Sequence, residues 1–275
     1  MTPQEAIQKV EEVFPFDYYI SADSKRYNNI LKTVLRYLHP PAKILDFGAG
    51  PADKTAMLAT LGFDCTACDD LQDDWHLFPG NREKILNFVH RFNIRYHVTN
   101  GNPLPFTPAE FDMVMMHDVL EHLHDSPREL INDLLELVKP EGLFFVTVPN
   151  AVNLRKRIAV LLGQTNMRPF DIYYWSPGPW RDHVREYVKD DLVKLAGYAN
   201  LEILELRSCH HMLRKLPKVT VELFKALTVV FPGFRDSWLL MAKKKPGWEP
   251  VRSIPREEVN KMLYSNDPVL RGVVK

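Results

Sequence analysis

The stretch from Lys43 to Leu71 constrains the fold of this 275-residue chain more than any other part of it. It opens with a short apolar run, Lys43 to Phe47, which is followed by a loop that contains Gly48 and Gly50. Apolar positions at helical spacing come next, and Phe63 to Cys68 then forms a second apolar run. Strand, glycine loop, helix and strand in this order predict a right-handed β-α-β unit, and therefore a parallel sheet flanked by helices.

Two aspartates follow the second strand, and they border the glycine loop in such a unit. The carboxyl ends of neighbouring parallel strands lie side by side, so Asp69 and Asp70 share one crevice with Gly48 and Gly50. Glycines let a ligand approach the main chain closely, and a carboxylate accepts hydrogen bonds from ribose hydroxyls. The crevice therefore suits a nucleoside.

The residue at position 53 narrows the choice of nucleoside. A dinucleotide-binding loop needs a third glycine there, but this chain has Asp53, which we expect to cap the helix and to repel a pyrophosphate. No Gly-Lys-Ser/Thr sequence follows the first strand either. The loop therefore favours a ligand without phosphate.

The charge balance and the cysteine content exclude several classes of protein. Lys and Arg total 35, as do Asp and Glu, so the formal net charge is zero and no nucleic-acid partner is expected. The sequence shows neither a secretory signal nor an uncharged apolar run of about 20 residues, so we expect a cytoplasmic protein, with peripheral contact at the inner face of a membrane left open. Cys65 and Cys68 lie in one strand and face opposite sides of the sheet, which argues against a zinc or redox pair.

The rest of the chain continues the alternation of helices and strands. Helical spacing predicts helices over 2–14, 24–38, 83–92, 126–137 and 189–199, and apolar runs predict strands over 94–98, 111–116, 143–148, 201–206 and 237–243. An acidic, aromatic loop over 72–80 is longer than a simple connection needs, and we expect it to overhang the crevice.

Two motifs carry a resemblance to a known family. Asp46-x-Gly48-x-Gly50-x-Ala52 resembles the Asp-x-Gly-x-Gly-x-Gly motif of S-adenosylmethionine-dependent methyltransferases, with alanine in place of the third glycine. The run from Phe111-Asp to Val119-Leu-Glu-His-Leu, followed by Lys139-Pro-Glu-Gly, is similar to the second signature of the small-molecule branch. The chain thus resembles the Rossmann-like class of these enzymes, and is closest to those of cell-surface polysaccharide and quinone pathways.

The resemblance implies an α/β fold with a definite layout. We expect a seven-stranded, mostly parallel, doubly wound sheet with an antiparallel last strand at its edge, N-terminal helices, and a helical and aromatic cap insert. Residues 1–245 would form the methyltransferase domain, with a lid insert at about 150–187 and a basic helical insert at about 208–235. Residues 246–275 would form a tail that wraps loosely.

The implied cofactor is S-adenosylmethionine, with S-adenosylhomocysteine as product. Asp69 would hold the ribose, the backbone around Ala49 the methionine portion, and Asp46 would orient the glycine loop. The stretch from Asn100 resembles the family's adenine-binding loop, which uses an acidic or amide side chain. The expected cofactor contacts are Asp46, Gly48, Ala49, Gly50, Asp69, Asp70, Asn100, Gly101, Asn102, His117 and Tyr27.

The insert after the fifth strand is rich in aromatic side chains, and loops beyond strand ends carry specificity. We expect it to act as a lid, with a packed surface excursion or a dimer contact as the alternative. His183, in a segment that resembles the family's His-x-Arg-x-Tyr/Phe, and His117 are the candidate catalytic bases. The expected acceptor contacts are Tyr173, Tyr174, Trp175, Trp180 and Arg185.

The second insert lies in a basic part of the chain. From residue 207 to 245, nine Lys or Arg stand against two acidic residues, and Val219–Phe231 predicts a helix with a wide apolar face. Such a helix suits an anionic membrane, a lipid-linked or phosphorylated substrate, a second subunit, or simple packing on the domain. Monomer and homodimer both stay open.

The histidines and carboxylates from His117 to Asp125 match no common zinc spacing, so no metal site is expected. The expected activity is methyl transfer from S-adenosylmethionine to an oxygen or nitrogen of a small molecule, and the resemblance alone favours a sugar or glycolipid acceptor. A lipid or quinone-like acceptor at a membrane surface is one alternative. An NAD-dependent oxidoreductase and a non-catalytic cofactor-binding protein are the others.

Overall fold

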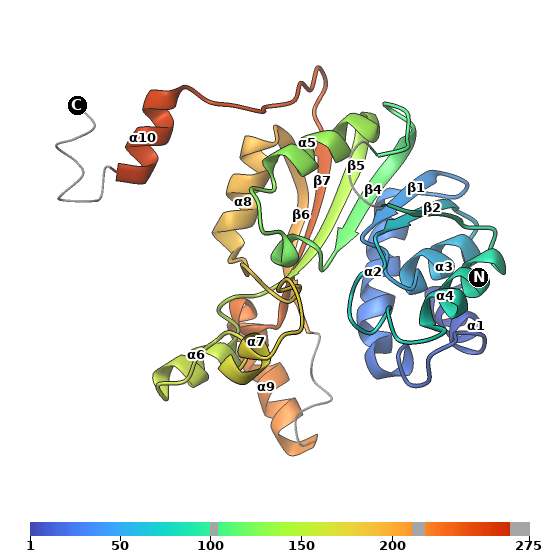
Figure 1. Ribbon diagram of the computed structural model, residues 1–275, viewed down its shortest axis with the longest axis horizontal. Coiled ribbons are helices and arrows are strands. Elements are labelled where there is room, and N and C mark those ends of the chain that lie inside the picture. Colours follow the sequence, from blue (N-terminus) through green and yellow to red (C-terminus); the bar gives the residue numbers. More distant parts are fainter. Residues whose placement is uncertain (100–103, 211–217, 265–275) are drawn as a thin grey trace.

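The computed structural model describes residues 1–99, 104–210 and 218–264 (Figure 1). Its seven-stranded sheet has the order β3-β2-β1-β4-β5-β7-β6, in which the first five are parallel and β7 is antiparallel to both neighbours. This confirms the expected doubly wound α/β sheet with an antiparallel last strand. The strands are β1 (Lys43–Phe47), β2 (Asp64–Asp69), β3 (Arg95–Val98), β4 (Phe111–His117), β5 (Val138–Pro149), β6 (Leu201–Cys209) and β7 (Ser237–Lys244).

The place of β7 in the sheet corrects the expectation. This strand lies between β5 and β6 and pairs with both, so β6 and not β7 forms the edge. The side chains explain the order, because the run from Trp238 to Ala242 is buried throughout, whereas β6 carries Glu202, Glu205 and Arg207. Charged side chains suit an edge strand, which has solvent along one side.

Helices cover both faces of the sheet (Figure 1). Met115 of β4 belongs to the core on one face and its neighbour Met116 to the core on the other, as the alternation of a strand requires. Cys65 and Cys68 divide between the two cores in the same way, which confirms that they face opposite sides. The first face packs against α1 (Pro3–Glu11), α2 (Ser24–Tyr37), α3 (Asp53–Thr60) and α4 (Asn81–His90), and the second against α5 (Arg128–Leu137) and α8 (Lys189–Tyr198).

Both inserts lie beyond the carboxyl ends of the parallel strands, at the end of the molecule that holds the glycine loop (Figure 1). The first contains α6 (Leu154–Leu161) and α7 (Phe170–Tyr174), and the second contains α9 (Lys218–Val230). No helix in the part of the chain that the structure describes is long and apolar enough to cross a bilayer. The described residues also include the short 3-10 turns η1 (Ser21–Asp23), η2 (Leu120–His122) and η4 (Pro232–Phe234).

The first part of the C-terminal tail is fixed to the domain, contrary to the expectation of a loose wrap. The Arg252 guanidinium donates to Glu129 Oε2 at 2.7 Å, Asp133 Oδ1 at 2.7 Å and Glu136 Oε1 at 2.9 Å, all on α5. Asn132 of the same helix exchanges two hydrogen bonds with the backbone of residue 251. Three carboxylates on one helix face thus share this cation, whereas α10 (Arg256–Tyr264) stands away from the domain (Figure 1).

Candidate active site

The glycine loop after β1 has a backbone that only glycine adopts without strain. Gly48 has a φ of +71°, and a Cβ added to it would lie 2.3 Å from Cγ2 of Val119, in the loop after β4. Gly50 has a φ of +52°, and its N–H donates to Asp69 Oδ2 at 2.8 Å. The loop is therefore pressed against one neighbouring strand end and hydrogen-bonded to the other.

Asp69 is held at the carboxyl end of β2 by backbone donors. Besides the bond from Gly50, its Oδ1 accepts from the N–H of Leu71 at 2.7 Å. Burial raises the pKa of Asp69, and the two backbone N–H groups oppose that rise. An ionised carboxylate offers about four acceptor positions, so two remain for the hydroxyls of a ribose.

A cavity of about 770 Å³ opens between these strand ends. Of the residues that the sequence predicts as cofactor contacts, those that line it are Gly48, Ala49, Gly50, Asp69, Asp70 and His117. Trp75 and His76 of the 72–80 loop also line the cavity, so this loop overhangs the crevice as expected. Asn100, Gly101 and Asn102 lie outside the described residues.

Two predicted cofactor contacts, Asp46 and Tyr27, lie behind the crevice and do not line it. Asp46 is 1% exposed and accepts a hydrogen bond from Thr55 Oγ1 at 2.6 Å, and burial raises its pKa to about 7. The hydroxyl of Tyr27 donates to the buried carboxylate of Asp53. Both side chains therefore support the glycine loop from below.

The expectation that Asp53 caps α3 is wrong. The N-cap is Ala52, which has a left-handed φ of 59° and makes no side-chain cap. This turn places Asp53 inside the first turn of the helix, where its buried carboxylate accepts from Tyr27 and lies 3.4 Å from Lys54 Nζ. Tyr27 and Lys54 thus take the place of the backbone N–H groups that a capping carboxylate would have bound.

A strap from the first insert crosses the mouth of the crevice. Arg181 Nη2 donates to both oxygens of Asp70, at 2.8 and 3.0 Å, and Arg181 Nε donates to Asp73 at 3.3 Å. On the other side, His122 Nδ1 lies 2.6 Å from the carbonyl of Arg181, and His124 Nε2 lies 2.6 Å from that of Trp180. Sequence reasoning missed Arg181, although the acidic 72–80 loop signalled the need for a cation.

His117 is 3% exposed at the end of β4 and lines the crevice. Burial holds its pKa well below the ordinary value of 6.5, so the imidazole is neutral. Its Nδ1 lies 3.0 Å from Thr147 Oγ1, which itself donates to Asp118 Oδ1 at 3.4 Å. Because the threonine proton is committed to Asp118, His117 donates through Nδ1–H and keeps a lone pair on Nε2, which has no partner among the described residues.

Of the five residues predicted to contact the acceptor, one lines the crevice and four do not. Trp180 lines the crevice, but Tyr173, Tyr174 and Trp175 of the α7 region are 57%, 62% and 77% exposed and do not. Arg185 also lies away from it and pairs with Asp191 at 3.5 Å. The structure therefore brings one of these five residues to the crevice, and the ring of Tyr173 packs against it, with its centroid 5.1 Å from that of Trp180.

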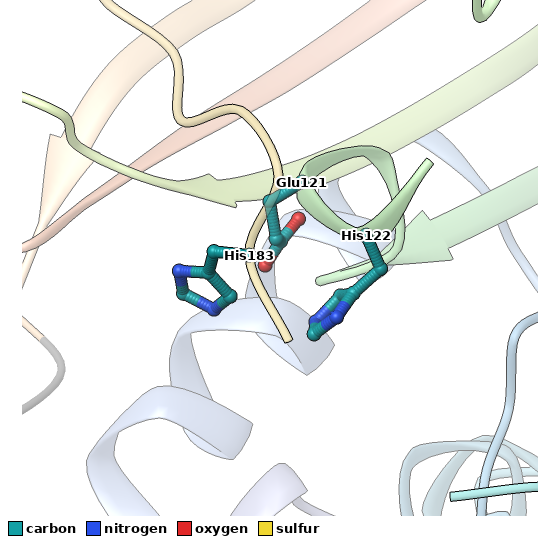
Figure 2. Close-up of side chains that lie close together, drawn as sticks. All are labelled: Glu121, His122 and His183. Carbon is teal, nitrogen blue, oxygen red and sulfur yellow. The ribbon is translucent and has the colours of Figure 1, made fainter. Parts of the chain in front are cut away.

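His183 meets two side chains from another part of the chain (Figure 2). Glu121 and His122 of η2 offer ligand atoms that lie, with one of His183, within 4.8 Å of one another. Burial lowers the pKa of His183 to about 4 and raises that of Glu121 to about 7. The local spacing from His117 to Asp125 does not reveal this group, because its third member comes from the first insert.

Comparison with known proteins agrees with this geometry. The methyltransferase domain family matches residues 19–206. The ubiquinone biosynthesis O-methyltransferase of Rickettsia bellii is 24% identical over 192 residues, which cover 70% of each chain. The demethylmenaquinone methyltransferase of Corynebacterium glutamicum is 31% identical over 105 residues, which cover 38% of this chain and 40% of that one.

Solved structures show the same fold. A methyltransferase from Methanosarcina mazei superposes with a TM-score of 0.54 at 18% identity, covering 78% of this chain and 97% of that one. A putative sarcosine dimethylglycine methyltransferase from Galdieria sulphuraria gives 0.54 at 16% identity, with 88% and 98% covered. Since the family match spans more than half of the sequence, the chain belongs to the methyltransferase domain family, the S-adenosylmethionine-dependent class that its motifs predict.

Proposed function

We propose that this enzyme transfers a methyl group from S-adenosylmethionine to an oxygen of a small apolar acceptor of lipid or quinone type. The observation that carries the choice of acceptor is the apolar surface of the inserts. The insert that contributes Trp180 to the crevice also exposes large apolar side chains, and α9 adds more. They include Leu161, Leu162, Phe170, Trp175, Leu223, Val229 and Val230.

A sugar acceptor has weaker support from this surface. The many hydroxyl groups of a sugar need hydrogen-bonding side chains, whereas most of the exposed side chains of α6 and α7 are aliphatic or aromatic. The basic side chains Arg155 and Lys156 of this insert are committed to Asp236 and Glu186. The relatives from Rickettsia bellii and Corynebacterium glutamicum, which are named for quinone methylation, support the same choice.

The residues of the crevice fit the cofactor. Gly48 and Gly50 present bare backbone, and Asp69 retains acceptor positions for two ribose hydroxyls. When bound there, S-adenosylmethionine supplies a methyl group on a sulfonium, which is already a good leaving group. The chain therefore has to position the acceptor oxygen and exclude water.

His117 is the better placed of the two candidate bases. Its side chain lines the crevice and its Nε2 has no hydrogen-bond partner among the described residues, whereas His183 does not line the crevice. The low pKa of His117 suits this task, because an oxygen that is receiving a methyl group becomes strongly acidic and a weak base suffices to take its proton. The strap of Trp180 and Arg181 lies at the mouth of this crevice, where it would exclude water during the transfer.

The first test is calorimetric titration with S-adenosylmethionine and S-adenosylhomocysteine, with NAD as control. Micromolar binding of S-adenosylmethionine and S-adenosylhomocysteine, without binding of NAD, supports the proposal. Tight binding of NAD would favour the oxidoreductase alternative instead. Product formation is then followed with a hydroxylated short-chain quinol and with a nucleotide sugar. Methylation of the sugar and not of the quinol would overturn the acceptor class while leaving the cofactor assignment intact.

A second test addresses the surface that carries the acceptor. We expect the enzyme to sediment with vesicles that contain phosphatidylglycerol, because exposed apolar side chains enter the interface and nearby cations meet anionic headgroups. The double variant Leu161→Asp, Leu162→Asp should lose this binding and keep its affinity for S-adenosylhomocysteine. Equal sedimentation of variant and parent would remove α6 from the membrane-facing surface.

A further inference from the structure

Glu121, His122 and His183 form a cluster at the junction of the η2 turn and the first insert (Figure 2). Each contributes one ligand atom to a group whose members lie within 4.8 Å of one another. From this geometry we propose that the three side chains bind one divalent transition-metal ion. The proposal goes beyond methyl transfer, since metal binding needs neither cofactor nor acceptor.

The carboxylate of Glu121 is the strongest argument for an ion. The residue is 0% exposed, and neither of its oxygens has a hydrogen-bond partner among the described residues. A buried carboxylate without donors is costly, and native proteins pair such groups with a cation or coordinate them to a metal. The nearby charged groups are already paired with one another: Lys156 with Glu186, Arg168 with Asp182, and Arg26 with Asp118.

Both histidines hold Nδ1 against a hydrogen-bond acceptor. His183 Nδ1 lies 2.7 Å from Glu186 Oε1, and His122 Nδ1 lies 2.6 Å from the carbonyl oxygen of Arg181. A carbonyl oxygen and a carboxylate are both acceptors, so each imidazole donates through Nδ1–H and carries its lone pair on Nε2. Histidines that ligate metals usually hold their second ring nitrogen in this way, with a carboxylate or carbonyl fixing the ring.

The backbone fixes the parts of the cluster relative to one another. The carbonyl oxygen of Glu121 accepts from the N–H groups of Val184 at 2.7 Å and Arg185 at 3.2 Å. This pair of bonds ties the segment that follows His183 to the η2 turn. The ligands therefore belong to two chain segments that are already joined, and an ion needs no large rearrangement to bind.

The donor set indicates the kind of ion. Two imidazoles and one carboxylate suit Zn²⁺, Co²⁺, Ni²⁺ or Fe²⁺, whereas Ca²⁺ and Mg²⁺ prefer oxygen ligands. Three protein ligands leave coordination positions open. Since His122 also lines the crevice, an acceptor oxygen that occupied an open position would be more acidic. This effect on the acceptor rests on the proposed function, whereas the binding of the metal ion does not.

The experiment uses the full chain after dialysis against a chelator. Calorimetric titration with Zn²⁺ should show one saturable equivalent, and Co²⁺ should give the visible absorption of a site with nitrogen ligands. Replacement of any one ligand, by Glu121→Gln, His122→Asn or His183→Asn, should weaken Zn²⁺ binding by about 100-fold, and Glu186→Gln by about 10-fold. Ca²⁺ should not compete.

The matched control is His124→Gln, because His124 lies near η2 and contacts the strap but is outside the cluster. It should bind Zn²⁺ as the parent does. Thermal unfolding and far-ultraviolet circular dichroism report whether each variant is folded. Absence of a saturable equivalent in the parent, Zn²⁺ affinity unchanged in folded Glu121→Gln, or equal competition by Ca²⁺ would each overturn the proposal.

Discussion

The cofactor side and the acceptor side of this enzyme are built in different ways. The glycine loop is fixed by backbone hydrogen bonds and by close packing, as Gly48 against Val119 shows. The first insert is joined to the η2 turn by two backbone hydrogen bonds, but its strap across the crevice is held by side chains, such as the ion pairs of Arg181, and much of its surface is exposed and apolar. A site made of backbone holds a constant ligand, while one made of side chains can change its acceptor by substitution.

The largest difference between the two regions is expected when one glycine in each is replaced by alanine. Gly48→Ala adds a methyl group 2.3 Å from Val119 at a φ of +71°, and should cost about 2–4 kcal/mol of unfolding free energy. Gly163→Ala in the first insert has a nearly equal φ of +72° but no atom within 4 Å, so about 1 kcal/mol is expected. Chemical denaturation measures the unfolding free energy of both variants. Equal losses would contradict the conclusion that close packing fixes the glycine loop.

The largest effect on cofactor affinity is expected when the Asp69 carboxylate is removed. Asp69→Ala loses charge-assisted hydrogen bonds to the ribose, and we expect a rise of about 10- to 100-fold in the Kd for S-adenosylhomocysteine. The control is Asp64→Ala, at the exposed opposite end of β2, which should bind as the parent does. Unchanged affinity in Asp69→Ala would contradict the ribose site.

The pH dependence of stability should reveal the buried support of the glycine loop. Burial raises the pKa of Asp46 from 3.8 to about 7, so the folded state holds this proton more tightly than the unfolded state. The free energy of unfolding should therefore fall as pH rises from about 4 to about 7, and Asp46→Asn should remove this contribution, about 4 kcal/mol for a rise of about 3 in the pKa. Denaturation at several pH values tests the difference between parent and variant, and parallel curves would refute it.

The smallest effect is expected at the strap. Arg181→Ala removes partly exposed ion pairs to Asp70 and Asp73, each worth about 0.2–1 kcal/mol, so S-adenosylhomocysteine should dissociate about 2- to 5-fold faster. Arg185→Ala is the matched control, because Arg185 belongs to the same insert but pairs with Asp191. Stopped-flow displacement measures both rates, and equal rates would show that the strap does not retain the cofactor.

The cofactor side could be predicted because its signals are local. Gly48, Gly50 and Asp69 lie within one β-α-β unit, and the handedness of that unit alone brings them together. The order of the last two strands could not be predicted so simply. Both are apolar enough to be strands, and the choice of edge depends on the distribution of charge along β6 against the buried run of β7.

The acceptor side could not be predicted because its contacts join distant segments. The aromatic residues of the first insert suggested a lined pocket, but an aromatic side chain carries no signal of direction, and Tyr174 faces solvent while Trp180 faces the crevice. His183 meets Glu121 only because the insert folds back on η2. Pairing of this kind is decided by tertiary structure and leaves no pattern in the sequence.

The position of β7 between β5 and β6 sets an order of events during synthesis. The strand ends at Lys244, so β5 keeps an unpaired edge until nearly the whole domain has left the ribosome. The edge strand β6 is made earlier but has no neighbour until β7 arrives. The nascent enzyme can therefore assemble its cofactor loops first, while completion of the sheet waits for the last strand, whose pairing closes contacts over a long stretch of chain.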